Sequence, residues 1–72
     1  MSPRLPTITA KKLLRVLAAR GFEQVRQSGS HVVLKHADGR RTTVPVHGGR
    51  DLGKGLLRQI LRDTGLGAAD IT

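Results

Sequence analysis

Residues 22–46, FEQVRQSGSHVVLKHADGRRTTVPV, decide the fold. Apolar and polar residues alternate here with a period close to two, which is typical of β-strands. The three strand-like runs are FEQVRQ (22–27), SHVVLKH (30–36) and RRTTVPV (40–46). Residues 28–29 (Ser-Gly) and 37–39 (Ala-Asp-Gly) separate them and are typical tight-turn sequences. Such short connections join adjacent antiparallel strands, so we expect a β-meander.

A helix is expected on each side of this meander. Thr9 is placed to cap a first helix that runs to about Arg20 and stops at Gly21, and a second helix runs from about 55 to 64 with Gly65 as its C-cap. Their apolar residues at helical spacing are Leu13, Leu14, Leu17 and Ala18, then Leu56, Leu57, Ile60 and Leu61. The pattern predicts an α+β fold of order α-β-β-β-α, with a three-stranded antiparallel sheet and both helices on one face.

The length of 72 residues predicts a single domain spanning 1–72. Residues 1–8, with Pro3 and Pro6, are expected to form an extended leader, and residues 67–72 are expected to fray. No stretch resembles a signal peptide or reaches the roughly 20 apolar residues of a membrane span. The chain has no cysteine. These features favour a cytoplasmic protein without disulfides.

The charge balance points to a polyanionic partner. Thirteen Lys and Arg against five Asp and Glu give a formal net charge of +8. In so small a domain this charge favours nucleic acid, with a solubilising basic surface or an acidic protein partner as the alternatives. Phe22 is the only Phe, Tyr or Trp, so base stacking on aromatic rings is excluded. Recognition must therefore rest on phosphates, 2′-hydroxyls and shape.

Side-chain alternation divides the middle strand into two faces. Val32 and Leu34 share one face, whereas His31, Val33 and Lys35 share the other. We expect the helices to cover the Val32 and Leu34 face. His31 and Lys35 would then lie on the open side of the sheet.

Two familiar kinds of site are not favoured. The loop GGRDLGKG (48–55) matches the G-x-x-x-x-G-K part of a phosphate-binding P-loop, but Gly55 replaces the Ser or Thr that would bind Mg²⁺. The three histidines do not form a pair at helical spacing, and no cysteine is present. We therefore predict neither a metal nor a cofactor, and we interpret the loop as a basic turn able to contact a phosphate.

Metal-free cleavage of RNA is the chemistry that the remaining polar residues fit. It requires a base for the 2′-OH proton, cations for the charge on phosphorus, and an acid or water for the leaving oxygen. Histidine suits the first role because its unperturbed pKa of about 6.5 lies near working pH. His31 begins a strand directly after the Gly29 turn. It is the candidate base, and an ordinary polar strand end is the alternative.

The candidate RNA-binding residues surround this histidine or lie at the start of the first helix. They are Lys11, Lys12, Arg26, Gly29, Ser30, Lys35, Arg40, Arg41 and His47. Because cations oppose the dipole of a first helical turn, the two lysines are either solvated or bind a phosphate drawn there by backbone N–H groups. His36 and His47 have the character of surface polar residues, with a role for His47 as a second proton carrier as the alternative.

The chain resembles the HicA toxin family, the small mRNA interferases of bacterial toxin–antitoxin systems. The resemblance covers roughly residues 9–66. The matching segments are Arg20-Gly21-Phe22, Arg26-Gln27-Ser28-Gly29-Ser30-His31, Asp38-Gly39-Arg40-Arg41, Val44-Pro45-Val46-His47, and the second helix through Leu57, Ile60 and Leu61. One departure is that residues 55–57 read Gly-Leu-Leu where the family commonly has Gly-Thr-Leu.

The resemblance implies a fold like that of double-stranded-RNA-binding domains, metal-independent endoribonuclease activity on mRNA, and a HicB-type antitoxin that covers the site. The catalytic Gly-Ser-His histidine of the family falls on His31, which would be the general base. Two alternatives remain, because fold does not settle function. One is a non-catalytic RNA-binding module of the same fold, and the other is a basic domain that binds an acidic protein.

Overall fold

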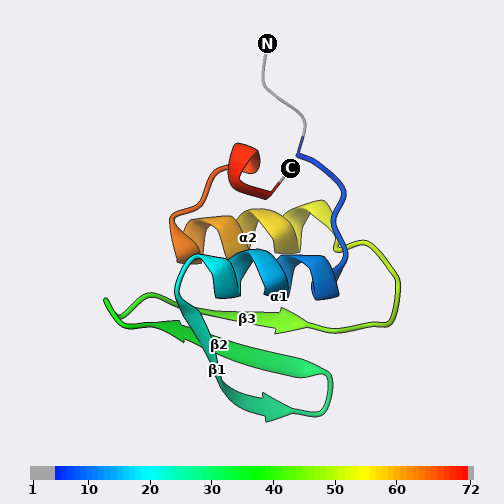
Figure 1. The fold of residues 1–72 in the computed structure, drawn as a ribbon. Helices are drawn as coiled ribbons and strands as arrows, with labels where there is room; N and C mark the ends of the chain where they lie inside the picture. The colour runs from blue at the N-terminus through cyan, green and yellow to red at the C-terminus, as the bar shows by residue number, and fades with distance from the viewer. Residues whose placement is uncertain (1–4, 72) are drawn as a thin grey trace.

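A computed structural model describes residues 5–71, and its elements follow the predicted order (Figure 1). They are α1 (Ala10–Ala19), β1 (Phe22–Ser28), β2 (His31–His36), β3 (Arg41–Pro45), α2 (Lys54–Thr64) and the 3₁₀ helix η1 (Ala68–Ile71). The sheet has the order β1-β2-β3 with both pairs antiparallel, and α1 and α2 lie side by side on one side of it (Figure 1). The α-β-β-β-α prediction is confirmed. None of the helices within residues 5–71 is long and apolar enough to cross a membrane.

The helix ends follow the capping residues in the sequence. The Thr9 hydroxyl accepts a hydrogen bond from the Lys12 backbone N–H at 3.2 Å, which satisfies one of the free donors in the first turn of α1. Helix α2 begins at Lys54 after Gly53, which provides no side-chain cap, and ends at Gly65 in the left-handed conformation (φ 73°). The start of α2 therefore leaves its first N–H groups without a side-chain acceptor.

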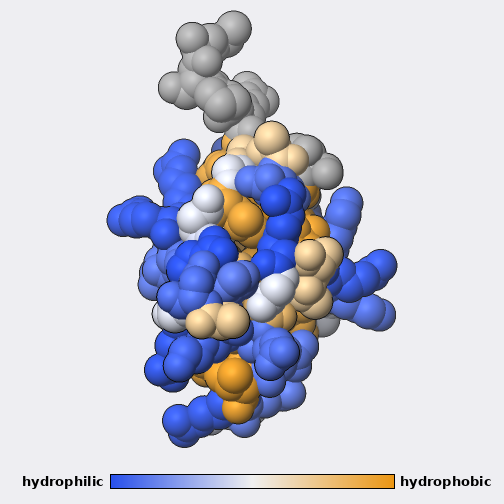
Figure 2. Space-filling view, turned by 60° about the vertical axis from the view of Figure 1, so that its left-hand side comes forward, coloured by the Kyte–Doolittle hydropathy of each residue, from blue (hydrophilic) through white to orange (hydrophobic). Residues whose placement is uncertain are grey.

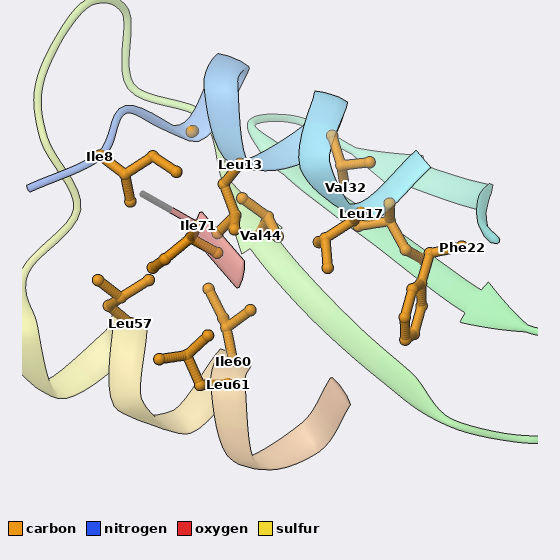
Figure 3. Close-up of a cluster of buried hydrophobic side chains, with 12 residues drawn as sticks. Ile8, Leu13, Leu17, Phe22, Val32, Val44, Leu57, Ile60, Leu61 and Ile71 are labelled. Carbon is orange, nitrogen blue, oxygen red and sulfur yellow. The ribbon is translucent and has the colours of Figure 1, made fainter. Parts of the chain in front are cut away.

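The hydrophobic core lies between the helix pair and the sheet (Figure 3). Its members are Ile8, Ala10, Leu13, Leu17, Phe22, Val32, Leu34, Val44, Leu57, Ile60, Leu61 and Ile71. The members from α1 and α2 recur at helical spacing, and those from β2 and β3 occupy alternate positions. Each large side chain contributes about 1.5–3 kcal/mol of transfer free energy on burial. This core fixes which face of the sheet remains open.

The predicted division of the middle strand is confirmed. Val32 and Leu34 are buried at 3% and 1% exposure, whereas His31 and Lys35 are exposed and Val33 is half-buried. A slip of one residue in register would exchange these two sets. The helix-covered face of β2 therefore holds the core, and the opposite face carries the polar residues.

The C-terminal segment corrects one expectation. Residues 67–72 were expected to fray, but Ala68–Ile71 forms η1 and Ile71 is only 2% exposed. Asp70 accepts a hydrogen bond from the Gly67 N–H at 2.7 Å and forms an ion pair with Arg20 at 2.7 Å. The segment is ordered because a buried isoleucine and a local cap hold it against α1. Thr72 lies outside the described residues.

The N-terminal segment also takes part in the core. Residues 5–8 have neither helix nor strand, as the leader prediction implies, but Ile8 is 1% exposed. Its carbonyl oxygen accepts the Leu52 N–H at 2.9 Å, which ties the segment to the loop before α2. The part of the predicted leader at positions 1–4 lies outside the described residues.

Strand β1 is an edge strand with an irregular register. The pairing with β2 shifts between Gln24 and Arg26, which places a β-bulge at Val25. A bulge increases the local twist and makes an edge less suitable for pairing with another chain. Val25 is the large hydrophobic residue with substantial exposure, 54%, among those described. The surface in Figure 2 is mostly hydrophilic, with small separate apolar areas.

Candidate active site

His31 lies at the start of β2 on the open face of the sheet. The turn before it contains Gly29 in the left-handed region (φ 57°). Behind that turn, the Ser30 carbonyl oxygen accepts the Val46 N–H at 2.7 Å, and His31 itself pairs with Pro45 across the ladder. The backbone of His31 is therefore held by β3. Its side chain is exposed and has no hydrogen-bond partner within residues 5–71.

Three predicted RNA-binding cations share this face. Lys35 pairs with Arg41 on β3, and Arg26 pairs with Val33 on β2. Directly paired residues project to the same side of a sheet, so Arg26, Lys35 and Arg41 lie on the side of His31. All three are exposed and, among the described residues, none forms an ion pair. An imidazole and three unpaired cations thus occupy one surface together with Glu23, which pairs with Lys35 from β1, and we call this surface the open face.

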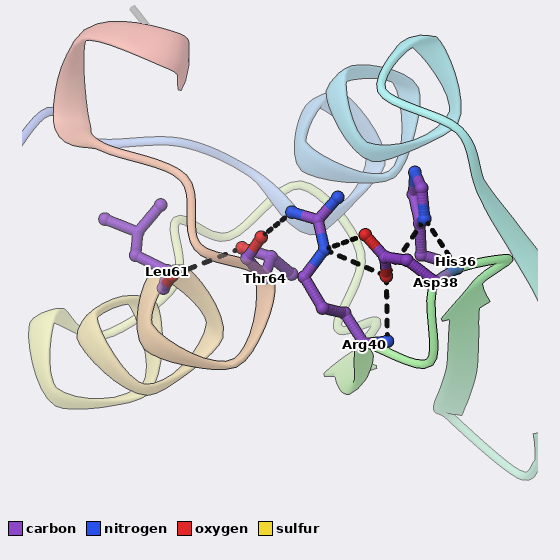
Figure 4. Close-up of polar contacts among 5 residues, drawn as sticks. All are labelled: His36, Asp38, Arg40, Leu61 and Thr64. Carbon is purple, nitrogen blue, oxygen red and sulfur yellow. Dashed lines mark hydrogen bonds and ion pairs between the residues drawn. The ribbon is translucent and has the colours of Figure 1, made fainter.

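Arg40 has a different environment from the other predicted RNA contacts. Its Nε donates to the Asp38 carboxylate at 2.9 and 3.1 Å, and its NH1 donates to the Thr64 carbonyl oxygen (Figure 4). The guanidinium carbon also lies 5.2 Å from the centre of the Phe22 ring. Arg40 joins the β2–β3 turn to the C-terminal end of α2, where a cation is favoured by the helix dipole. Its Nε and NH1 are engaged within the fold.

His36 lies on the helix-covered side, opposite to His31, and is half-buried, where a surface residue was expected. Its ring contacts Phe22 edge to face at 5.1 Å between centroids, and its Nδ1 accepts the Asp38 N–H at 3.1 Å. Gly21 leaves room for this ring, because a Cβ there would lie 2.8 Å from the His36 Nε2. The sequence did contain a signal for this position, since His36 and Leu34 are two residues apart and therefore lie on the same face of β2.

Two exposed carboxylates have altered acidity. The Arg40 backbone N–H, and then the Arg40 guanidinium, hold the pKa of Asp38 below its ordinary value of 3.8. The Gly67 backbone N–H and the Arg20 guanidinium lower the pKa of Asp70 in the same way. Both carboxylates serve the local structure of turns and lie apart from the open face.

Lys11 and Lys12 belong to the helix layer and not to the open face. Both are exposed in the first turn of α1. Figure 1 nevertheless shows that α1 and α2 both begin at the end of the molecule where the β1–β2 turn lies. The partial positive charge of each helix start adds to the cations there. The fold therefore brings the two lysines to the same end as His31, on the other layer.

A hollow of about 370 Å³ lies between the β3–α2 loop and the start of α2. Its lining residues are His47, Arg50, Asp51, Leu52, Gly53 and Leu56. His47 was a predicted RNA contact, whereas Arg50 was not. The signal for Arg50 was an arginine within a glycine-rich loop, which we interpreted only as a basic turn. We refer to this feature as the loop hollow.

Residues 5–71 contain no group of three or more His, Cys, Asp or Glu that could hold a metal ion. The open face and the loop hollow bring together imidazoles and cations, with one carboxylate in each, Glu23 beside Lys35 and Asp51 in the hollow. They are suited to proton transfer and to the stabilisation of phosphate charge.

The sequence of the whole domain was compared with known proteins. The family profile described as HicA toxin of bacterial toxin–antitoxin matches residues 10–66, from the start of α1 to two residues beyond α2. No curated protein gives a significant match. The matched range covers most of the chain and includes His31, the open face and the loop hollow. The chain therefore belongs to the HicA family, the toxin components of bacterial toxin–antitoxin systems.

Proposed function

We propose that this toxin is an endoribonuclease that cleaves mRNA without a metal ion and uses His31 as the general base. The observation that carries the proposal is the position of His31, an exposed imidazole on a backbone held by β3. Rigid backbone and a free side chain are what a base needs in order to reach the substrate in one orientation. Membership of the HicA family adds the toxin context.

The proposed reaction is an in-line transesterification. His31 takes the proton of a 2′-OH, the 2′ oxygen attacks the adjacent phosphorus, and the bond from phosphorus to the 5′ oxygen breaks. The products are a 2′,3′-cyclic phosphate and a 5′-OH. Arg26, Lys35 and Arg41 bind the phosphates on either side and stabilise the charge that develops on phosphorus. Arg40 is left out of this set because its donors bind Asp38 and Thr64.

The remaining predicted contacts extend the RNA path around the end of the molecule. The position of a Gly29 Cβ is open space, with no described protein atom within 4 Å, so an RNA backbone would have room to approach the turn there. Ser30 lies between that turn and the base. Lys11 and Lys12 would contact phosphates more distant from the scissile bond, since they lie on the helix layer.

Inhibition is proposed to occur by occlusion. A HicB-type antitoxin would cover His31 and the open face, and its contact surface would carry acidic residues to match Arg26, Lys35 and Arg41. Covering this face would also stabilise a small domain by mass action. Both proteins would act in the cytoplasm, where mRNA is translated.

The test uses purified protein, end-labelled mRNA and excess EDTA. Wild-type protein is expected to cut the RNA, and His31→Ala to cut it at least about 100-fold more slowly while binding it with similar affinity. The control is an unchanged circular dichroism melt, expected because His31 is exposed. Equal cutting by both proteins would remove His31 from the mechanism.

The two alternatives give other results in the same experiment. A non-catalytic RNA-binding module would bind the RNA with strong salt dependence and leave it intact. A basic domain for an acidic protein would bind RNA weakly even at low salt. Either result with wild-type protein would refute the ribonuclease proposal.

A further inference from the structure

We propose that His47 is the general acid of this reaction and donates a proton to the leaving 5′ oxygen from the edge of the loop hollow. The inference rests on the proposed ribonuclease function. It assigns a second catalytic residue and also places the nucleotide that follows the scissile bond.

Protonation of the leaving 5′ oxygen requires a group other than the base His31. In an in-line displacement the entering 2′ oxygen and the leaving 5′ oxygen lie on opposite sides of phosphorus. A base that hydrogen-bonds the 2′-OH is therefore on the wrong side to protonate the 5′ oxygen in the same step. An alkoxide leaves with difficulty unless a proton reaches it, so the second side needs a donor of its own.

The strand register places His47 two residues beyond the cross-strand partner of His31, at the same end of the sheet. Pro45 is the direct cross-strand partner of His31, and the ladder continues for one residue through the bond from the Val46 N–H to the Ser30 carbonyl oxygen. Val46 packs against the core. His47 follows directly after Val46, beyond the end of β3, where it is exposed and lines the loop hollow. Diagonal neighbours in such a ladder lie about 7–8 Å apart, a separation that leaves room for a phosphate between two imidazoles.

The loop hollow gives this position a binding surface. His47, Arg50 and the carboxylate residue Asp51 line it together with Gly53 and the apolar residues Leu52 and Leu56. The Arg50 N–H bonds to the His47 carbonyl oxygen at 3.4 Å, so a turn joins these two lining residues. Both side chains are exposed, and neither has a partner within residues 5–71. A ribose can lie on the leucines while Arg50 binds the next phosphate.

Two histidines account for both proton transfers of the reaction. Neutral His31 gains the 2′-OH proton as the bond from the 2′ oxygen to phosphorus forms. Protonated His47 loses a proton to the 5′ oxygen as the bond between phosphorus and that oxygen breaks. The enzyme leaves the step with His31 protonated and His47 neutral, and proton exchange with water restores the starting state. No co-reactant is needed.

The test compares two RNA substrates that differ only at the leaving atom. One is natural, and in the other a sulfur replaces the 5′ oxygen at the cleavage position. A thiolate leaves without protonation because thiols ionise near pH 8.5, far below an alcohol. His47→Ala is expected to cut natural RNA about 100-fold more slowly than wild type, yet to cut the sulfur substrate within about 5-fold of wild type. His31→Ala is expected to be slow on both.

A second variant separates the loss of the proton donor from the loss of a polar side chain at position 47. His47→Gln retains a polar side chain but has no acidic proton to donate, so it is expected to match His47→Ala on both substrates. Equal losses of cleavage rate on both substrates would make His47 a binding residue. An unchanged rate on natural RNA would exclude His47 from the reaction. Either result overturns the inference. Failure of wild type to cut natural RNA would instead refute the ribonuclease proposal.

Discussion

Replacing Gly21 by alanine tests the packing that holds the β2–β3 turn. Gly21 has φ 91°, and its missing Cβ would lie 2.8 Å from the Nε2 and 3.2 Å from the Cδ2 of His36. Gly39 is a matched control in the same chain, because its φ is 100° and no atom lies within 4 Å of its Cβ position. Both substitutions place alanine in the left-handed region. Only the one at Gly21 also displaces a neighbour.

The expected losses of stability follow from the left-handed backbone of the new alanine and from the displacement of His36. Alanine at Gly39 should lower the free energy of unfolding by about 1–2 kcal/mol, the cost of a left-handed L-residue. Alanine at Gly21 carries the same cost and also moves the His36 ring. That movement weakens the edge contact with Phe22, about 0.5–1.5 kcal/mol, and the hydrogen bond from the Asp38 N–H, about 0.5–1.5 kcal/mol. Gly21→Ala should therefore lose about 2–5 kcal/mol.

Urea denaturation followed by far-ultraviolet circular dichroism measures both losses. With a slope of about 1–3 kcal/mol per molar urea, the two variants should differ in midpoint by about 1 M. In a His36→Ala background the displaced ring is gone, so Gly21→Ala should then cost no more than Gly39→Ala. Equal losses for the two single variants, or an unchanged difference in that background, would refute the reasoning.

Three further predictions concern acidity, the C-terminus and RNA binding. Because the pKa of Asp38 is lowered in the folded protein, its carboxylate stabilises the fold above the ordinary pKa of 3.8. This stabilisation is lost as the pH falls through the folded pKa. The urea midpoint of Asp38→Asn should therefore fall less than that of wild type between about pH 5 and pH 2. Ile71→Ala should lower the free energy of unfolding by about 2–5 kcal/mol, whereas a loss near zero would mean that the segment frays. Arg41→Gln should reduce the slope of log affinity for RNA against log salt by about 1, and Arg62→Gln, in the last turn of α2, should leave it unchanged.

The elements with strong local signals were predictable from the sequence. Period-two runs joined by glycine turns determine the meander, and a threonine cap and a glycine stop define α1. Strand parity alone placed Val32 and Leu34 in the core and His31 on the open face. These predictions were successful because each depends on residues close together in the chain.

Features that depend on long-range contacts were not predictable. The packing of Ile71 against α1 joins distant parts of the chain, and a lone isoleucine in a short tail gives no periodic signal. Arg40 illustrates the same difficulty at the site. By composition it resembles its neighbour Arg41, but its guanidinium reaches Thr64 at the end of α2, and only the tertiary structure brings those two residues together.

The candidate site shows the same division between local and long-range information. The histidine of the Gly-Ser-His segment was identified from its turn and from the family resemblance. The loop hollow depends on how residues after β3 fold back onto the start of α2, so Arg50 was not predicted as a contact for RNA. Residues that bind substrate from loops are positioned by the whole scaffold.

Identification of the ends left on cut RNA tests the central claim most directly. Wild-type protein in EDTA should produce 5′ fragments that end in a 2′,3′-cyclic phosphate and 3′ fragments that begin with a 5′-OH. A single 2′-deoxy substitution before the scissile phosphate should abolish the cut, because His31 would then have no proton to remove. Fragments with a 3′-OH and a 5′-phosphate, or cutting that survives the 2′-deoxy substitution, would contradict the account.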